Sequence, residues 1–244
     1  MTVETLVLLT AGVFVIALLY SSVGHAGASG YIAVMSLLSL APVEIKPIAL
    51  ALNILVASIG SFQFWRAGHF SWSLFWPFAL LAVPFAFIGG YLNLPTRVFQ
   101  VIVGIVLLFS AAQFLIRPPV EGEPHPPARP LAVGVGAGLG LLSGLTGTGG
   151  GIFLTPLLIF MRWARTKNAA ATSALFILLN SIAGLLGNFS ATQKFPKFGL
   201  SLLFAAAAGG VIGSHFGSRR FEPTLIKRLL AVVLVIAGFK LILA

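Results

Sequence analysis

Residues 24–30 read GHAGASG, and residues 144–151 read GLTGTGGG. Each stretch lies between two apolar runs and interrupts with glycine what would otherwise be one continuous membrane segment. Irregular backbone is tolerated inside a bilayer only where it is buried in protein or lines a cavity. Two glycine-rich breaks at corresponding positions therefore indicate the binding site of a transporter built from broken helices.

The composition around these stretches is that of a membrane protein. Of 244 residues, 58% are hydrophobic and 8% are charged, whereas a soluble domain carries about a quarter charged residues. Apolar runs of spanning length recur, for example at 98–116 and 225–243. We expect the first apolar run to stay in the mature protein. The N-terminus carries Glu4 and no lysine or arginine, so the basic region typical of a cleavable signal peptide is missing. The sequence predicts an all-α, polytopic integral membrane protein.

The charged residues and the absent residue types exclude several classes of partner and cofactor. The formal net charge is +10 at pH 7, but the basic residues are spread among the loops, where they set topology and attract anions; no nucleic-acid partner is expected. Cysteine and aspartate are absent, which excludes disulfides and cysteine-bound metals. GLTGTGGG lacks the lysine of a P-loop, so no cofactor or bound nucleotide is expected. None of the five glutamates lies in the middle of an apolar run, and the coupling ion is left open.

The proline-rich segment RPPVEGEPHPPARP, 117–130, is interpreted as a polar linker between two transmembrane repeats, residues 1–116 and residues 131–244. Gly24, Gly27 and Gly30 recur as Gly144, Gly147 and Gly150, each 120 residues later (144 − 24 = 120). The distribution of lysine and arginine slightly favours an inverted repeat over a parallel one. We therefore predict a helical bundle of two pseudo-symmetric repeats with glycine-rich broken or re-entrant helices.

Each repeat contains five apolar segments, at about 3–23, 28–41, 45–65, 71–93 and 97–116 in the first and at about 131–145, 149–161, 168–188, 198–218 and 224–243 in the second. Segment 131–145 would be only about 22 Å long as a helix, and the segment after it is shorter still. Both are predicted to be half-helices that meet at a glycine tip near the middle of the bilayer.

The glycine motifs supply the first candidate site residues, which are Gly24, Gly27, Gly30, Gly147, Gly149, Gly150 and Gly151. Their backbone amides are expected to bind an anion at a half-helix N-terminus, assisted by the hydroxyls of Ser29 and Thr148. The alternative is that these glycines only allow close helix packing. His25 is the ionisable side chain of the motifs; it is either a proton-sensitive anion contact or a histidine bonded to backbone near the membrane interface.

Polar residues within the third segment of each repeat supply the second group of candidates, which are Asn53, Thr172, Ser173, Asn180 and Ser181. One interpretation is interhelical hydrogen bonding. The other is that the third segments lie beside the glycine tips and offer neutral donors to an oxyanion, with Asn53 and Asn180 as the preferred residues.

At SGLTGTGGGIFLTPLL (143–158), NAAATSALFILLNSIAGLLGN (168–188) and GHAGASGYIAV, the sequence resembles the TauE/SafE sulfite-exporter family of small bacterial membrane permeases. The first repeat departs from the usual pattern, because GHAGASG replaces a glycine triplet and Ser36 replaces the proline that stands at Pro156 in the second. The resemblance implies a multi-pass protein of the bacterial inner membrane. It also implies a secondary transporter and not an enzyme, which exports small sulfur-containing anions such as sulfite or organosulfonates or takes up related sulfur anions. From the broken helices we expect it to work by alternating access around a midplane site. A homodimer is among the assemblies left open.

The sequence leaves two alternative functions open. GASG, 27–30, fits the G-x-S-G motif of rhomboid intramembrane proteases, with Ser29 as nucleophile and His69 or His215 as base; the second motif, however, carries Gly149 where the first carries Ser29. The chain is alternatively a permease for another small anion or for a metal ion, although four scattered histidines and five glutamates make a poor ligand set.

Overall fold

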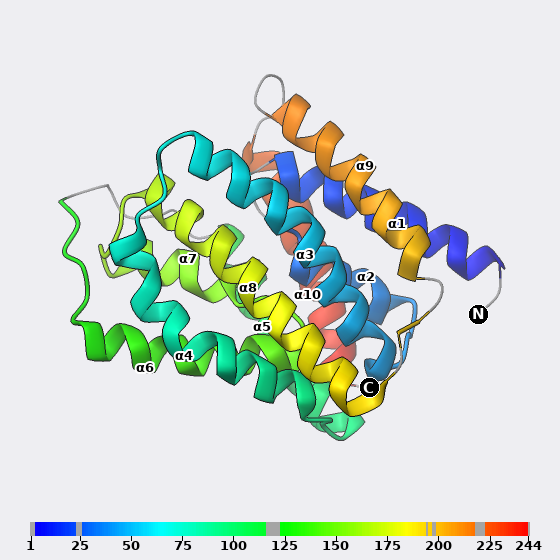
Figure 1. The fold of residues 1–244 in the computed structure, drawn as a ribbon. Helices are drawn as coiled ribbons and strands as arrows, with labels where there is room; N and C mark the ends of the chain where they lie inside the picture. Colours follow the sequence, from blue (N-terminus) through cyan, green and yellow to red (C-terminus); the bar gives the residue numbers. More distant parts are fainter. Residues whose placement is uncertain are drawn as a thin grey trace. The chain divides into compact units, whose positions relative to one another are not determined.

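The structure is a computed structural model that describes residues 3–22, 26–115, 123–193, 195–196, 199–217 and 223–243. The described residues form ten α-helices and no strand (Figure 1). In chain order these are α1 (Val3–Ser22), α2 (Ala28–Leu37), α3 (Pro42–Arg66), α4 (Trp72–Tyr91), α5 (Thr96–Leu115), α6 (Arg129–Thr146), α7 (Gly151–Phe160), α8 (Thr166–Thr192), α9 (Gly199–Gly217) and α10 (Pro223–Leu243).

Each helix coincides with one of the ten apolar segments expected from the sequence. Five stretches within them are long and apolar enough to cross a membrane: Val3–Ser21, Pro42–Arg66, Trp72–Tyr91, Thr96–Gln113 and Lys167–Thr192. The prediction of an all-α polytopic membrane protein is confirmed.

Both glycine motifs interrupt the helical chain. In the second, α6 ends at Thr146 and α7 begins at Gly151; in the first, α1 ends at Ser22 and α2 begins at Ala28. Helices α2 and α7 have ten residues each, or about 15 Å at about 1.5 Å per residue. This is about half of the hydrocarbon core, which is about 30 Å thick, so both helices are too short to span it.

Helix α6 is longer than expected. It has 18 residues, or about 27 Å, because it begins at Arg129 inside the segment interpreted as a linker. Pro130 does not prevent this, since proline is well tolerated in the first turn of a helix, where its missing N–H would have no partner. The prediction that 131–145 is a half-helix is therefore wrong in length, whereas α7 is as short as predicted.

The chain folds into two compact units, each of which combines helices from before and after the proline-rich segment. Unit 1 comprises residues 1–56, 94–116 and 194–244, and unit 2 comprises residues 57–93 and 117–193. The units are defined by contacts and the repeats by sequence. The boundaries at 1–116, 117–130 and 131–244 therefore stay a prediction.

Unit 1 is built around two long helix pairs, α1 with α9 and α5 with α10, and α2 packs against α10 and α1 (Figure 1). Glycines make the close approaches. A Cβ on Gly209 or Gly213 of α9 would overlap the carbonyl oxygens of Phe14 or Leu18 on α1. Such small-residue contacts are typical of helix pairs in membranes, where no hydrophobic effect draws helices together.

Unit 2 is built around α4, which packs along both α6 and α8, while α7 packs against α8 (Figure 1). Three glycines of α6 at four-residue spacing face the α4 backbone. A Cβ on Gly136, Gly140 or Gly144 would overlap the carbonyl oxygen of Phe78, Ala82 or Ala86, respectively. Gly144, one of the glycines on which the predicted repeat rests, is therefore a helix-packing residue and not part of the turn.

Candidate anion-binding site

The break between α6 and α7 is a run of left-handed glycines. Gly147, Gly149 and Gly150 have φ angles of 82°, 75° and 78°, in a region that residues with a side chain rarely adopt. The Gly147 N–H donates to Ser143 O at 2.8 Å and ends α6. Glycine turns of this kind can direct successive N–H groups into a concavity that binds anions.

Helix α7 starts with uncapped N–H groups. Its N-cap is Gly150, and no described side chain caps it by a hydrogen bond. The first N–H groups of a helix have no intrahelical acceptor, and the partial charge at this end is positive. Because residues 147–151 are buried, the N–H groups of Gly151 and Ile152 are suited to bind a buried anionic group.

Helix α8 packs directly against this helix start. A Cβ on Gly150 would lie 2.9 Å from Phe176 Cε1, and a Cβ on Gly151 would overlap the Ile177 side chain and lie 3.5 Å from Ser173 O. Phe176 and Ile177 therefore identify the face of α8 that meets the break. Gly151 has a packing role here in addition to carrying one of the terminal N–H groups.

The predicted polar residues of α8 lie on this same face. Thr172 and Asn180 are four residues before and after Phe176, and Ser173 and Ser181 stand in the same relation to Ile177. Residues at four-residue spacing follow one another along one side of a helix. The structure thus brings Thr172 and Ser173 to one turn before the contact with α7, and Asn180 and Ser181 to one turn after it.

These side chains are buried with unsatisfied polar atoms. Thr172, Ser173, Asn180 and Ser181 are at most 2% exposed, and so is Ser143 near the end of α6. Their hydroxyl oxygens, and both amide atoms of Asn180, have no hydrogen-bond partner in the described part of the chain. Buried polar groups nearly always have partners, and leaving them unpaired is costly. Their concentration around one helix start suits a polar ligand.

The predicted site residue Thr148 makes a hydrogen bond within the turn. The Thr146 hydroxyl donates to Leu142 O at 2.7 Å, and the Thr146 and Thr148 hydroxyl oxygens are 2.9 Å apart. A hydroxyl has a single proton, so the bond between the two threonines uses the proton of Thr148. In this conformation Thr148 holds the turn together and has no hydroxyl proton for an anion.

The first glycine motif lies in unit 1. Gly27 is the N-cap of α2 with a φ angle of 87° and no capping side chain. The Ser29 hydroxyl lies 2.8 Å from the Tyr20 hydroxyl, and a Cβ on Gly30 would meet Ile16 and Tyr20, so Gly30 is a packing glycine. The predicted residues Gly24 and His25 lie outside the described residues, so no geometry is assigned to the histidine.

Two polar residues of α3 are buried in unit 1. Asn53, a predicted site residue, is 0% exposed. Lys46 is 5% exposed and is the charged residue among the buried side chains that the structure describes. Lys46 is not among the candidates predicted from sequence, because it stands near the start of segment 45–65, where a lysine is expected to lie at the membrane interface. Ionisable residues inside membrane helices often mark a substrate pathway, and this rule would have identified it.

The structure also changes the internal correspondence between the motifs. By helix start, Gly27 corresponds to Gly150, a separation of 123 residues (150 − 27) and not of 120. Asn53 and Asn180 are 127 residues apart (180 − 53), and at that separation Lys46 corresponds to Ser173 (173 − 46). At this separation, the first half of the chain carries a buried lysine where the second half carries a buried serine.

The alternative chemistries find no support at these positions. The partner of the Ser29 hydroxyl is the phenol of Tyr20, which is not the imidazole that a serine nucleophile needs. His215 has no described side chain. Among the described residues, no three histidine, cysteine, aspartate or glutamate side chains lie close enough to hold a metal ion.

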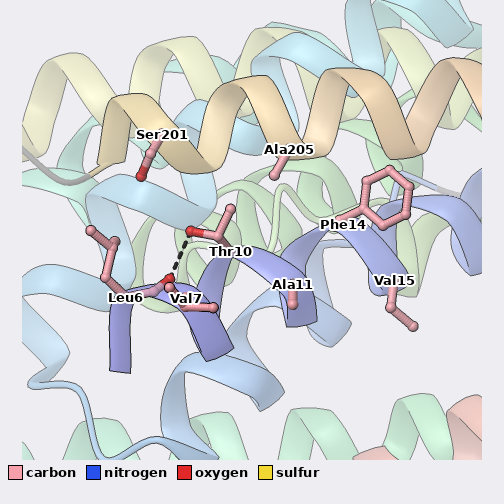
Figure 2. A pocket seen from close by; sticks show the side chains of 8 residues that line it. All are labelled: Leu6, Val7, Thr10, Ala11, Phe14, Val15, Ser201 and Ala205. Carbon is pink, nitrogen blue, oxygen red and sulfur yellow. Dashed lines mark hydrogen bonds between the residues drawn. The ribbon is translucent and has the colours of Figure 1, made fainter. Parts of the chain in front are cut away.

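A groove of about 570 Å³ runs between α1 and α9 in unit 1, away from the glycine motifs in sequence (Figure 2). Its lining is mainly apolar, with Phe14 and Val15 on α1 and Ala205 on α9. Thr10 also lines it but donates its hydroxyl to Leu6 O at 2.7 Å (Figure 2). A surface of this kind suits lipid chains better than a small anion.

Comparison with known proteins identifies the family of the chain. The family model described as "Sulfite exporter TauE/SafE" matches residues 8–241. The "Probable membrane transporter protein y4hK" of Sinorhizobium fredii is 42% identical over 235 residues, which cover 94% of this chain and 95% of that protein. The "Probable membrane transporter protein YunE" of Bacillus subtilis is 29% identical over 123 residues, which cover 50% and 45%.

No solved structure matches the chain. The family consists of membrane transporters and not of enzymes, which agrees with the helical architecture and excludes the protease reading. On the match over nearly its whole length, this multi-pass membrane protein belongs to the sulfite exporter TauE/SafE family.

Proposed function

We propose that the protein is a secondary transporter that exports small sulfur-containing anions, such as sulfite or organosulfonates, by alternating access around a site at the start of α7. Membership of the transporter family supports the general function. The family description supports a sulfur oxyanion as the substrate class, and the geometry of unit 2 supports the position of the site.

One observation carries the proposal: the N-terminus of α7 packs against α8 beside Phe176, and Asn180, one turn further along α8, has an amide without a partner among the described residues. Gly150 begins α7 without a capping side chain, and Asn180 is 0% exposed. The helix supplies N–H donors and a positive field, and the asparagine side chain adds two N–H donors. Sulfite and sulfonate groups carry several oxygen acceptors that match such a set.

The donors on α8 and at the end of α6 are neutral. Ser143, Ser173 and Asn180 carry no charge, and backbone amides contribute only partial charge. A transport site must bind well enough to select its substrate and weakly enough to release it. A ring of neutral donors meets both requirements better than a buried cation in direct contact with the anion would.

The break also provides what a moving site needs. Glycines at 147, 149 and 150 let the backbone turn sharply, and a discontinuous helix holds a substrate at the depth where access alternates between the two sides of a membrane. Residues 147–151 are buried in this conformation. Transport therefore requires an opening that exposes them to water on one side at a time.

Flux in proteoliposomes tests the proposal. The purified protein is reconstituted, and efflux of radiolabelled sulfite, sulfate, thiosulfate, taurine and sulfoacetate is compared with efflux from protein-free vesicles. We expect saturable efflux of sulfite or of one of the organosulfonates, inhibited by an excess of the same unlabelled anion. Equal leakage of all five anions with and without protein would refute the assignment.

A further inference from the structure

The start of α2 in unit 1 resembles the start of α7 but has different side chains around it. Gly27 is the N-cap with a φ angle of 87°, and as a glycine it has no side chain to cap the helix. Gly27, Ala28, Ser29 and Gly30 are all buried. The first N–H groups of α2 have no acceptor within the helix; the Gly30 N–H is bonded to the Tyr20 hydroxyl, and those of Ala28 and Ser29 precede it.

The phenol of Tyr31 lies over this helix start. The Tyr31 N–H donates to Gly27 O at 3.0 Å, which closes the first turn. Side chains on a helix point back toward its N-terminus, so a residue covers the turn that precedes it. A Cβ on Gly27 would accordingly lie 3.0 Å from both Cζ and Oη of Tyr31. The hydroxyl is held at the break itself.

The Tyr31 hydroxyl has no hydrogen-bond partner among the described residues, although Tyr31 is 0% exposed. The neighbouring phenol differs, because the Tyr20 hydroxyl lies 2.8 Å from Ser29 Oγ. A buried tyrosine normally finds a partner for its hydroxyl. A buried phenol that has no partner among the described residues and is directed at this helix start is therefore an independent indication of a ligand at this place.

We infer that the Tyr31 hydroxyl donates a hydrogen bond to the transported anion at the start of α2. The start of α2 is thus a second substrate position, and its donors differ from those at α7. This inference rests on the proposed function. In unit 2 the side-chain donors are aliphatic hydroxyls and an amide, whereas in unit 1 the donor is a phenol beside a helix N-terminus. Tyr31 is thus a specificity-determining residue for the oxyanion and not only a core residue.

The substitution Tyr31→Phe separates this role from a structural one. It removes one oxygen atom and keeps the ring that packs over Gly27. If the hydroxyl is merely an unpaired group, its removal relieves an unfavourable burial and leaves transport unchanged, with thermal stability unchanged or raised. If it binds the anion, the KM for efflux rises about tenfold or more, since hydrogen bonds to charged groups are the stronger class.

The experiment measures sulfite efflux from proteoliposomes, with KM and Vmax determined separately, together with the melting temperature in detergent. Tyr91→Phe is the matched control, because Tyr91 on α4 is 53% exposed and its substitution should leave KM within twofold. Tyr20→Phe reports on the neighbouring bond to Ser29 and should change KM less than Tyr31→Phe does.

The outcomes distinguish the inference from the proposed function. Sulfite efflux by the wild type with a raised KM for Tyr31→Phe and an unchanged or higher melting temperature supports the inference. Wild-type efflux with an unchanged KM for Tyr31→Phe overturns it and leaves the proposed function intact. Absence of efflux by the wild type for sulfite and for each organosulfonate overturns both.

Discussion

The backbone of Gly150 passes so close to the ring of Phe176 that a Cβ on the glycine would lie 2.9 Å from Phe176 Cε1. Gly150 also has a φ angle of 78°, so it lacks both the space and the backbone conformation for a side chain. The contact fixes the first turn of α7 against the polar face of α8, and the first prediction follows from it.

Gly150→Ala is expected to destabilise the protein and to abolish efflux. The left-handed backbone costs about 1–3 kcal/mol for a residue with a side chain, and the new methyl group displaces Phe176. Gly134→Ala is the control, since Gly134 on α6 is exposed and a Cβ there meets nothing within 4 Å. Alanine in that helix should be neutral or stabilising. Melting temperature and flux measure both variants; equal behaviour of the two would contradict the packing described here.

Asn180→Leu is expected to reduce sulfite efflux at least about tenfold without loss of stability. Both amide atoms of Asn180 lack a partner among the residues that the structure describes, so an apolar side chain of similar size removes donors from the substrate and none of the described hydrogen bonds of the fold. The melting temperature and the KM for sulfite efflux are measured for the variant and the wild type in parallel.

Asn168→Ala provides the contrast for this prediction. The Asn168 amide donates to His69 O at 2.8 Å, so its loss should lower stability by about 1 kcal/mol and leave KM unchanged. If Asn180→Leu instead unfolded the protein and Asn168→Ala raised KM, the roles assigned to the two asparagines would be reversed.

Lys46→Met is expected to weaken transport of anions. Lys46 is buried within a spanning segment of α3, where a positive charge is retained only at a cost and commonly serves the substrate. Its removal lowers the local positive potential and should raise the KM for sulfite several-fold. Arg97→Gln, an exposed cation at the start of α5, is the matched substitution and should shift KM by less than twofold. A Lys46→Met protein with normal KM would assign the lysine a structural role.

Lys240→Met is expected to loosen α2 without changing substrate preference. Lys240 Nζ donates to Ser36 O at 3.2 Å, to Leu37 O at 2.8 Å and to Ser39 Oγ at 3.0 Å. A cation at a helix C-terminus stabilises it, by about 1 kcal/mol at a partly exposed site. The melting temperature should fall, and the order of anions in the flux panel should stay the same. Lys167→Met, at an exposed position of α8, should leave both unchanged.

The helices were largely predictable from sequence, because length and hydropathy alone define segments that must bury their backbone polar groups in lipid. The start of α6 could not be predicted, because a proline-rich stretch is typical of a linker. In the structure Pro130 instead occupies the first turn of the helix, where proline is tolerated. The polar face of α8 was predictable in part. Asparagine and serine stand out in an apolar run, whereas the face they occupy depends on the packing of Phe176 against Gly150.

Other parts of the site could not be predicted from residue types. Gly144 and Gly150 look alike in a motif, but one meets the α4 backbone and the other forms a turn. From sequence, Tyr31 would be predicted to be an aromatic residue of the core. Only the position of its hydroxyl over Gly27 in the structure indicates a further role. The hydroxyl of Thr148 was expected to bind substrate, and its bond to Thr146 depends on local geometry that the sequence does not encode in an obvious way.

Locating a bound oxyanion tests the central claim most directly. Selenite has the shape and charge type of sulfite and scatters X-rays anomalously, so its position can be found in crystals of the wild-type protein grown with it. The account predicts a selenium peak within hydrogen-bonding reach of the Gly151 and Ile152 amides and of the Asn180 side chain. An occupied selenite site elsewhere in the membrane region, with the start of α7 filled by protein side chains, would contradict it.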